Sequence, residues 1–353
     1  MSKLITITDL QRAAETYDNT LRKLPYLGLS ETLNNLGITM LEVDGKDKVV
    51  VYHRKGGLAR PYTMGSENQV LSGDIGKAFE RVLDPQECYT ALKDHILNYK
   101  AKRVISNASE KPDRKAKDHP LELLIIDSKV KTVGEDIITA LFHAKRDEVD
   151  KSPMGMFDGF NEQIDKEVAA GEIAPTKGNL KITGAFSAPV DDNDMTAFNT
   201  LVDFLRSASP FLRKNGILYI TQDTLFHCMD ALGNKLKYKN ALEYDVFLKH
   251  LQGITQAPNL KLFTDPALGS GSRLMYTVPY NLDFGVGTAG EEQFVQIRAP
   301  YEDPNIVQFW MQWMAGTRIT SIHAKEFMTN EQVNTSEDLS GDYKEAPAEP
   351  PVG

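Results

Sequence analysis

The stretch that decides the fold runs from Phe294 to Phe327 and reads FVQIRAPYEDPNIVQFWMQWMAGTRITSIHAKEF. Its alternating and β-branched residues predict three strands, separated by turns at Pro304-Asn305 and Gly316-Thr317. Both tryptophans of the chain, Trp310 and Trp313, lie in the middle run. Large aromatic side chains on extended segments favour packing in a sheet. Such a sheet either packs inside a monomer or completes one building block of a larger assembly.

The composition around this stretch is that of an ordinary globular protein. The chain has 353 residues, of which 41% are hydrophobic and 25% charged, so its length predicts two or three domains. The formal net charge of -9 argues against a free-standing nucleic-acid binder, although it leaves room for a locally basic face. Cys88 and Cys228 have no metal-binding spacing and are expected to be buried free thiols. No segment reads as a signal peptide or membrane span, which predicts synthesis in a reducing cytoplasm.

The first part of the chain predicts two helices and a hairpin. Helical spacing covers Leu10–Leu24, and a second helix over Ser30–Leu36 is stopped by a glycine. The next run, ITMLEVDGKDKVVVYHR, places two β-branched segments on either side of Asp44-Gly45, which is a strong signal for a two-residue hairpin. Glycines and an extended segment follow. We therefore expect the hairpin to project from the body as an arm.

Two further helices are predicted before residue 150. The pattern from Pro85 to Ile105 is helical, and the residues from Leu121 to Phe142 carry one apolar stripe of a long helix. The members of that stripe are Leu123, Ile126, Val130, Val133, Ile137 and Leu141.

The later part of the chain alternates helices and strands, which indicates a compact α/β subdomain. Asp194 or a neighbour is expected to cap a helix that ends near Leu205. The elements expected after that helix are a strand over Gly216–Thr221, a helix over Asp223–Leu232, and strands over Leu260–Thr264 and Arg273–Val278. The C-terminal residues, rich in Glu, Pro and Ser, predict a disordered acidic tail.

The glycines from Gly285 to Gly290 match the dinucleotide-binding pattern GxGxxG. A working fingerprint must open a helix whose N-terminus holds the pyrophosphate. Here Glu291 and Glu292 follow, and then the strand-like run FVQIR. We therefore interpret the glycines as a hairpin turn. The acids from Asp191 to Asp194 fit helix capping better than a metal loop, and the seven histidines form no catalytic or metal motif.

The sequence contains two groups of basic residues, at 53–60 and 100–117. The first lies on the expected arm, either as a solvated loop or as a cationic surface that covers an acidic neighbour; it comprises His53, Arg54, Lys55 and Arg60. The second has no interleaved aromatic residues, so it would make only nonspecific phosphate contacts. Its members are Lys100, Lys102, Arg103, Lys111, Arg114, Lys115 and Lys117.

The order of these elements resembles that of the major capsid proteins of tailed bacteriophages, which share the Hong Kong 97-type fold, and in particular those of phages that infect Bacteroidetes. The resemblance spans most of residues 38–328 and rests on element order, since no matching segment is a catalytic signature. The segments that carry it are KVVVYHRKGGLARPY, HPLELLIIDSKVKTVGEDIITALFHAKRDE with MGMFDGF, NGILYITQDTLFHCMDAL, and SRLMYTVPYNLDFGVGT with DPNIVQFWMQWMAGTRITSIHAKEF.

The resemblance implies an α+β fold divided as in these capsid proteins. The implied parts are an N-terminal arm (1–37), an extended E-loop hairpin (38–68), a peripheral domain with a spine helix (69–190), an axial α/β domain (191–258), returning strands of the peripheral and axial domains (259–329) and the acidic tail (330–353). The segment Leu121–Phe142 is the expected spine, with Pro85–Ile105 as its competitor.

The function implied by the resemblance is structural, with no enzyme activity, cofactor or metal. Copies of the chain would form hexamers and pentamers of an icosahedral head shell around double-stranded DNA, assembled in the cytoplasm of a host bacterium and located in the virion capsid. Further implied partners are portal, scaffolding and decoration proteins. The resemblance implies no contact with a membrane. Trp310 and Trp313, with the basic residues of the arm, are candidate contacts between subunits, and the run from Lys100 to Lys117 is a candidate DNA-facing strip.

Two alternatives remain open from the sequence. An encapsulin-like compartment shell would have the same fold and would hold cargo enzymes instead of DNA. A soluble α/β enzyme would build its active site from residues that are distant in the sequence.

Overall fold

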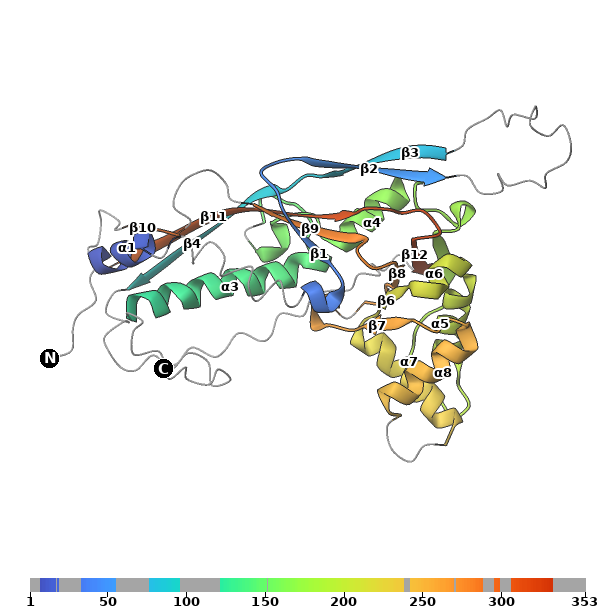
Figure 1. Ribbon diagram of the computed structural model, residues 1–353. Coiled ribbons are helices and arrows are strands. Elements are labelled where there is room, and N and C mark those ends of the chain that lie inside the picture. Colours follow the sequence, from blue (N-terminus) through green and yellow to red (C-terminus); the bar gives the residue numbers. More distant parts are fainter. Residues whose placement is uncertain are drawn as a thin grey trace, which may run out of the picture.

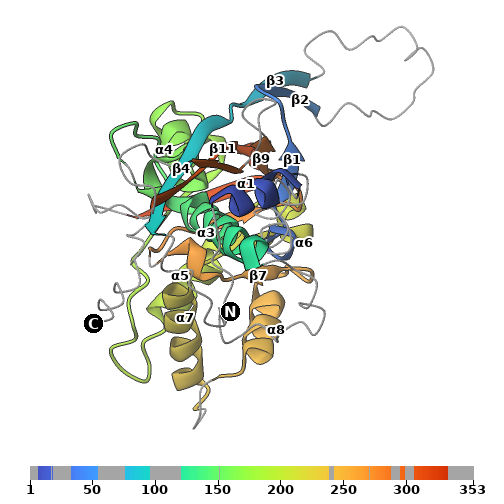
Figure 2. The same ribbon diagram turned by 90° about the vertical axis from the view of Figure 1, so that its left-hand side faces the viewer.

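The computed structural model describes residues 7–16, 18, 33–54, 76–95, 121–150, 152–237, 242–269, 271–287, 295–298 and 306–332. It has an elongated body built on a five-stranded sheet and a long helix, a two-stranded arm and a helical lobe (Figure 1). Both views place the arm and the lobe on opposite sides of the body (Figure 2). None of the helices within these ranges is long and apolar enough to cross a membrane.

The body sheet is organised around β11 (Ile306–Ile319), which contains both tryptophans. One side of β11 pairs antiparallel with β4 (Gln86–His95), and the other side pairs antiparallel with β9 (Leu282–Gly287) and β10 (Val295–Arg298). β1 (Thr39–Glu42) completes the sheet in parallel with β9. The stretch at 294–327 therefore supplies the central strand of the body, as its aromatic content predicted.

The turn predicted at Gly316-Thr317 is wrong, because β11 continues through both residues. A side chain at Gly316 would lie 3.0 Å from the Cα of Pro85. The glycine therefore lets the strand pass close to the start of β4 without bending it. The third predicted run does not continue as one strand either, since a loop at 320–326 separates β11 from β12 (Phe327–Gln332).

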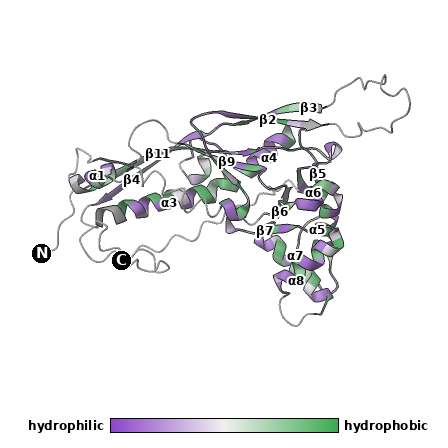
Figure 3. Ribbon diagram, in the orientation of Figure 1, coloured by the Kyte–Doolittle hydropathy of each residue, from purple (hydrophilic) through white to green (hydrophobic). Residues whose placement is uncertain are grey.

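The long helix predicted over 121–142 is confirmed as α3 (Leu121–His143), which lies along one face of the body sheet (Figure 1). The predicted stripe faces the core: Ile126, Val130, Val133, Ile137 and Leu141 are at most 1% exposed, and the side chain of Leu123 lies outside the described residues. The helix α1 (Ile7–Thr16) packs beside α3 and β10, and residues 19–24 of the predicted helix lie outside the described residues. Figure 3 shows hydrophobic and hydrophilic residues alternating along both helices, as an amphipathic packing arrangement requires.

The helix predicted from Pro85 to Ile105 is wrong over residues 86–95, which form β4, and residues 96–105 lie outside the described residues. Cys88 and Leu92 face the core beside α3, whereas Tyr89 and Lys93 face outward. This is an alternation of period two, which extended backbone produces and a helix does not. Pairing with β11 along the whole of β4 overrides the weak helical spacing of these residues.

The hairpin predicted at Asp44-Gly45 is also wrong. The strand before this bend, β1, joins the body sheet, and the strand after it, β2 (Asp47–Arg54), pairs antiparallel with β3 (Gly76–Leu83). The chain therefore leaves the body at 43–46 and forms a ribbon of β2 and β3, which we call the arm. Its strands occupy 47–54 and 76–83, so the arm extends beyond the predicted range 38–68.

The second sheet connects the body to the helical lobe. Its order is β5 (Leu180–Thr183), β12, β8 (Met275–Thr277), β6 (Ile217–Tyr219) and β7 (Lys261–Phe263). The lobe consists of α5 (Thr196–Ser207), α6 (Pro210–Asn215), α7 (Gln222–Lys235) and α8 (Tyr244–Thr255), which share a separate hydrophobic core with this sheet. The predicted α/β alternation is confirmed. The N-cap residue of α5 is Met195, which makes no side-chain capping bond, and the side chain of the preceding Asp194 accepts a hydrogen bond from the Thr196 amide at 3.0 Å.

The predicted start of the tail at residue 330 is too early, because β12 extends to Gln332. Asn330 is 1% exposed and its side-chain oxygen accepts a hydrogen bond from the Leu274 amide at 2.7 Å. Buried backbone and amide groups need such partners, so these residues belong to the sheet. Residues 333–353 lie outside the described residues.

The first two glycines of the GxGxxG match belong to a strand. Gly285 and Gly287 lie inside β9, so the predicted turn is wrong for these positions, and Gly290 lies outside the described residues. A side chain at Gly285 would lie 2.6 Å from Leu83 Cδ2, and one at Gly287 would overlap the carbonyl oxygen of Val43. Gly285 and Gly287 therefore allow the start and end of the arm to approach β9 closely.

We expect Gly287→Ala to lower the free energy of unfolding by about 2–3 kcal/mol, because the added methyl group has to displace backbone. The matched control is Gly253→Ala on α8, where nothing lies within 4 Å of the added carbon. That change should raise the free energy of unfolding by about 1 kcal/mol through the better helix propensity of alanine. Urea unfolding followed by circular dichroism measures both. Equal effects of the two substitutions would contradict the packing role of Gly287.

The helix α3 carries one carboxyl group with a strongly altered acidity. Burial, assisted by the charge of Glu135, raises the pKa of Asp136 to about 6. The unfolded chain keeps the ordinary value of about 4, so the folded state favours the protonated form. Stability from this group is present below about pH 4 and is lost as the pH rises through 6. Asp136→Asn should therefore raise the free energy of unfolding by about 2 kcal/mol at pH 7.5 and by little at pH 4. Urea titrations at the two pH values test this, and a pH-independent gain would contradict it.

Candidate assembly surfaces

The arm carries the first candidate contact surface. Cross-strand pairs place Val50, Tyr52 and Val82 on one face of the ribbon, and they are 63%, 53% and 45% exposed. Lys48 and Glu80 lie on the same face and form an ion pair at 3.3 Å. A two-stranded ribbon is only marginally stable alone in water. The outer face of the arm, defined by these five residues, therefore needs another surface to bury its apolar side chains.

The root of the arm is fixed to the body by a buried charge network. Arg318 on β11 is 3% exposed and donates to Asp283 Oδ2 on β9 through Nη2 at 2.7 Å. Its Nη1 reaches Asp47 Oδ2, at the first residue of β2, at 3.1 Å. Thr320 also donates to Asp283, at 2.6 Å. Buried charges are tolerated when they are paired and hydrogen-bonded in this way, and here the pairing sets where the arm leaves the sheet.

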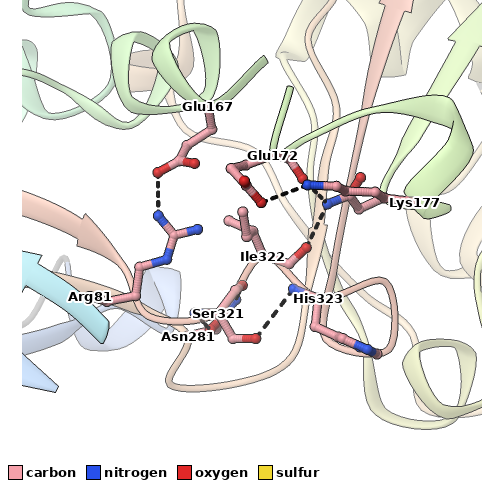
Figure 4. A network of polar contacts seen from close by, with 9 residues as sticks. Arg81, Glu167, Glu172, Lys177, Asn281, Ser321, Ile322 and His323 are labelled. Carbon is pink, nitrogen blue, oxygen red and sulfur yellow. Dashed lines mark hydrogen bonds and ion pairs between the residues drawn. The ribbon is translucent and has the colours of Figure 1, made fainter. Parts of the chain in front are cut away.

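A second ion pair holds the other strand of the arm. Arg81 on β3 pairs with Glu167 on α4 (Phe160–Ala169), and both side chains are about one-fifth exposed. Figure 4 shows this pair at one side of a polar network and Glu172 with Lys177 at the other. The last contact is between the Asn179 amide and the carbonyl oxygen of Ile322, at 2.7 Å. The arm therefore meets the body through salt bridges at both strands.

Between these contacts lies a groove of about 440 Å³ under the inner face of the arm. Val51 and Phe79 of the arm line one wall, and Ile322 and Ala324 line the other. Phe79 remains 45% exposed there. The inner face is therefore covered in part by the body, in contrast to the outer face.

The second surface is the face of the body sheet that points away from α3. Trp310 on β11 stacks on Tyr89 of β4, with ring centroids 5.1 Å apart and planes 14° apart. The guanidinium of Arg298 on β10 lies 5.8 Å from the centre of the Trp310 ring, within cation–π range. Tyr89 is 59% exposed. We call Tyr89, Trp310 and Arg298 the aromatic patch.

Trp313 has the opposite orientation, because side chains alternate along β11. It is 1% exposed and belongs to the core between the sheet and α3, together with Phe309 and Met311. The expectation that both tryptophans are candidate contacts between subunits is therefore wrong for Trp313. Trp310 keeps that candidacy, because it lies on the outward face.

The predicted basic residues fall mostly outside the part of the chain that the structure describes. His53 and Arg54 end β2, but their side chains are not described, and neither Lys55 nor Arg60 lies in the described ranges. The whole run Lys100, Lys102, Arg103, Lys111, Arg114, Lys115 and Lys117 also lies outside them. Three residues of these surfaces were not predicted from the sequence: Tyr89, Arg298 and Arg318. Only the period-two alternation within QECYTALKDH could have placed Tyr89 on an outward face.

The two cysteines are held in an unreactive form by burial. Both cysteines are buried free thiols, as expected, and burial raises the pKa of Cys88 to about 12. Thiols held in the protonated form are poor nucleophiles. Among the described side chains, no three His, Cys, Asp or Glu residues gather closely enough to hold a metal ion.

No protein-family model and no curated protein matches the sequence. Solved structures do match. The satellite phage P4 procapsid, solved with its size determination protein, aligns over 87% of this chain and 98% of that chain with a TM-score of 0.51 and 12% identity. The capsid of Myoviridae phage XM1 aligns over 86% and 92% with a TM-score of 0.50 and 8% identity. A virus-like particle from Pyrococcus furiosus aligns over 89% and 99% with a TM-score of 0.44 and 11% identity.

The chain thus has the fold of tailed-phage capsid proteins, and the predicted α+β fold of the Hong Kong 97 type is confirmed. The described elements with this fold are the body sheet with α3, the arm and the helical lobe (Figure 1).

Proposed function

We propose that this protein is the major capsid protein of a tailed bacteriophage. Copies would assemble into hexamers and pentamers and close an icosahedral shell around double-stranded DNA, first in the host cytoplasm and finally as the virion capsid. The observation that carries the proposal is the projecting arm, whose outer face leaves Val50, Tyr52 and Val82 exposed in a chain with a capsid fold. A marginal ribbon with an apolar face is a liability in a monomer and a contact in an assembly.

The parts of the chain take the following roles in this proposal. The arm and residues 55–75 between its strands serve as the E-loop, α3 is the spine of the peripheral domain, and the lobe from α5 to α8 is the axial domain around each ring axis. Contacts of this kind are heterologous, because different surfaces of identical copies meet, and they close into rings when the rotation fits. Many modest contacts then give a stable shell.

Partners other than the chain itself follow from the same proposal. Portal, scaffolding and decoration proteins would bind particular sites of the shell. The basic run from Lys100 to Lys117 would contact packaged DNA without sequence preference, which suits an otherwise acidic chain. Charge reversal in that run should reduce DNA retention in particles, and unchanged packaging would count against this role.

The test of the proposed function is assembly of the purified chain, followed by size-exclusion chromatography and negative-stain microscopy. We expect closed particles from the unmodified chain, and loss of particles in Val50→Asp with Tyr52→Asp, because charges on the outer face of the arm cannot be buried against a neighbour. The control is Val190→Asp, which alters a side chain that is 89% exposed outside the arm and should leave assembly intact.

The outcomes separate the alternatives. A chain that stays a monomer or dimer under all assembly conditions points to the soluble enzyme. Particles that enclose a cargo enzyme, from a gene beside the enzyme gene, indicate an encapsulin-like compartment. Particles filled with DNA, from a gene among portal and terminase genes, support the capsid.

A further inference from the structure

One long edge of the body sheet has no partner strand among the described residues. β4 pairs with β11 on one side over its whole length, and no described strand pairs with its other side. Figure 2 shows β4 at one side of the body sheet and β1 at the other. An open edge of this kind is a row of N–H and C=O groups that can bind a further strand. The edge of β4 is therefore a candidate binding surface for an extended segment.

Both ends of this edge are covered by side chains of the same chain. Arg146 donates through Nη1 to the carbonyl oxygen of Glu87 at 3.4 Å, and the amide of His95 donates to Oδ1 of its neighbour Asp94 at 2.8 Å. In an antiparallel pair, the backbone groups of successive residues point alternately toward the partner strand and away from it. Glu87 and His95 are eight residues apart, so every second residue between them also points away from β11.

The middle of the edge is open. Tyr89, Ala91 and Lys93 are the residues that direct their N–H and C=O groups away from β11 there, and no described residue bonds these groups. All three side chains are exposed. The open part of the edge therefore presents a donor and an acceptor at each of three alternate residues. Another extended strand can satisfy all six groups at once.

This open segment is complementary to itself. When two copies of β4 lie antiparallel with Ala91 opposite Ala91, Tyr89 of each copy lies opposite Lys93 of the other. Each strand then has all six of its open groups bonded, and the covered ends stay as they are. A register displaced by two residues in either direction would place Glu87 or His95, which already have partners, opposite an open residue. The backbone therefore selects one register.

The side chains of that register are complementary as well. One face of the Tyr89 ring stacks on Trp310 of β11, so the other face is turned away from β11, over the open edge. Lys93 of the second copy lies opposite and brings its ammonium group to that face, where a cation–π contact can form. The two Lys93 side chains are four residues apart along the strands, about 14 Å, so the like charges do not meet.

We infer that the open edge of β4 pairs antiparallel with β4 of a second copy of this chain, around a two-fold axis at Ala91. The two body sheets then form one continuous sheet. The inference rests on the proposed function for its place in the shell. A two-fold contact is isologous, whereas the contacts that close a ring are heterologous, so the β4 contact would link subunits of adjacent rings.

A single substitution tests the pairing. Ala91→Cys places two identical thiols opposite each other across the axis. Their Cα atoms would be about 5.5 Å apart, as in a hydrogen-bonded antiparallel pair, and a disulfide spans that distance. Particles of this variant are oxidised and run on a denaturing gel without reductant, where we expect covalent dimers. The native Cys88 and Cys228 are buried and should not contribute.

The matched control is Lys93→Cys, on the same face of the same strand. In the proposed register its two thiols lie about 14 Å apart, beyond the reach of a disulfide, so we expect no dimer. Val190→Cys, at a residue that is 89% exposed on another part of the chain, measures random oxidation.

A second variant tests the backbone instead of the side chain. Ala91→Pro removes an N–H group that points to the open edge and takes no part in the pairing with β11, and proline is tolerated at edges of this kind. Circular dichroism should show a folded subunit, while the yield of particles falls at least tenfold. Ala91→Ser keeps the N–H group and should assemble like the unmodified chain.

The outcomes separate the inference from the proposed function. Dimers of Ala91→Cys well above both cysteine controls support the inference. Particles without such dimers, equal dimer yields for Ala91→Cys and Lys93→Cys, or normal assembly of a folded Ala91→Pro chain overturn it, while the proposed function stands. If the unmodified chain forms no particles, the proposed function fails. Oxidation of the free Ala91→Cys chain then decides the pairing, which a dimer supports and a monomer overturns.

Discussion

Arg318→Ala is expected to lower the free energy of unfolding by about 3–5 kcal/mol, because it leaves a buried carboxylate without its partner. Arg318 is 3% exposed and Asp283 is 6% exposed, so water cannot replace the lost contacts. Alanine also removes the bond from Arg318 Nη1 to Asp47 at the start of the arm. The measurement is urea unfolding of the purified chain under conditions that keep it unassembled.

A double variant separates the charge from the packing. Arg318→Met with Asp283→Leu removes both charges and keeps most of the volume, so its stability should lie much closer to the unmodified chain than that of Arg318→Ala. Thr320 loses its acceptor in this variant, which should cost about 1 kcal/mol. A double variant as unstable as Arg318→Ala would contradict the view that the unpaired carboxylate causes the loss of stability.

The same network links stability to the geometry of the arm. Asp47 is the first residue of β2 and its side chain is 42% exposed, so its bond to Arg318 contributes modestly to stability by itself. The position of Asp47 is nevertheless fixed by its bond to the buried guanidinium of Arg318. We therefore expect Asp47→Ala to leave the fold intact while loosening the angle at which the arm leaves the body.

The elements that the sequence predicted well are those whose pattern is local. The stripe of α3 repeats over six positions, and each of the five described members is buried. The lobe was predicted because helices and strands alternate there with clear starts, such as Asp194 before α5. In both cases neighbours in the sequence decide the structure, so a single chain carries enough information.

The elements that the sequence missed are decided by distant partners. Asp44-Gly45 has the local composition of a hairpin, but Thr39–Glu42 pairs with residues more than two hundred positions later in β9. The segment after Pro85 has weak helical spacing and becomes a strand through its pairing with β11. Long-range pairing overrides local propensity in sheets, and no pattern within either segment reveals the partner strand.

The assembly surfaces were partly predictable for the same reason. The projecting arm and Trp310 were named from composition, yet the orientation of each tryptophan depends on the register of β11 against its neighbours. The patch also needs Tyr89 and Arg298, which come from strands 200 residues apart in the chain. The patch forms only through the pairing of β4 and β10 with β11, so no local sequence pattern predicts it.

The two tryptophans should therefore respond in opposite ways to the same substitution. Trp313→Ala removes a side chain that is 1% exposed at the centre of the body core and should lower the free energy of unfolding by about 3–5 kcal/mol. Trp310→Ala removes a ring from the outward face and should cost about 1 kcal/mol, mainly through the stack on Tyr89. Urea unfolding of the unassembled chain measures both values.

Particle assembly should depend on Trp310, in contrast to the stability of the subunit, which depends mainly on Trp313. Trp310→Ala should yield folded subunits that form few or no particles, because the outward aromatic patch, the candidate contact between subunits, loses its largest side chain. Trp310→Phe keeps an aromatic face and should restore part of the particle yield, whereas Trp313→Phe should recover most of the lost stability. A Trp310→Ala chain that assembles normally contradicts the role of the patch. A Trp313→Ala chain as stable as the unmodified protein contradicts the placement of that ring in the core. Since both residues lie three positions apart on one strand, opposite outcomes would tie each effect to the face of the sheet on which the side chain lies.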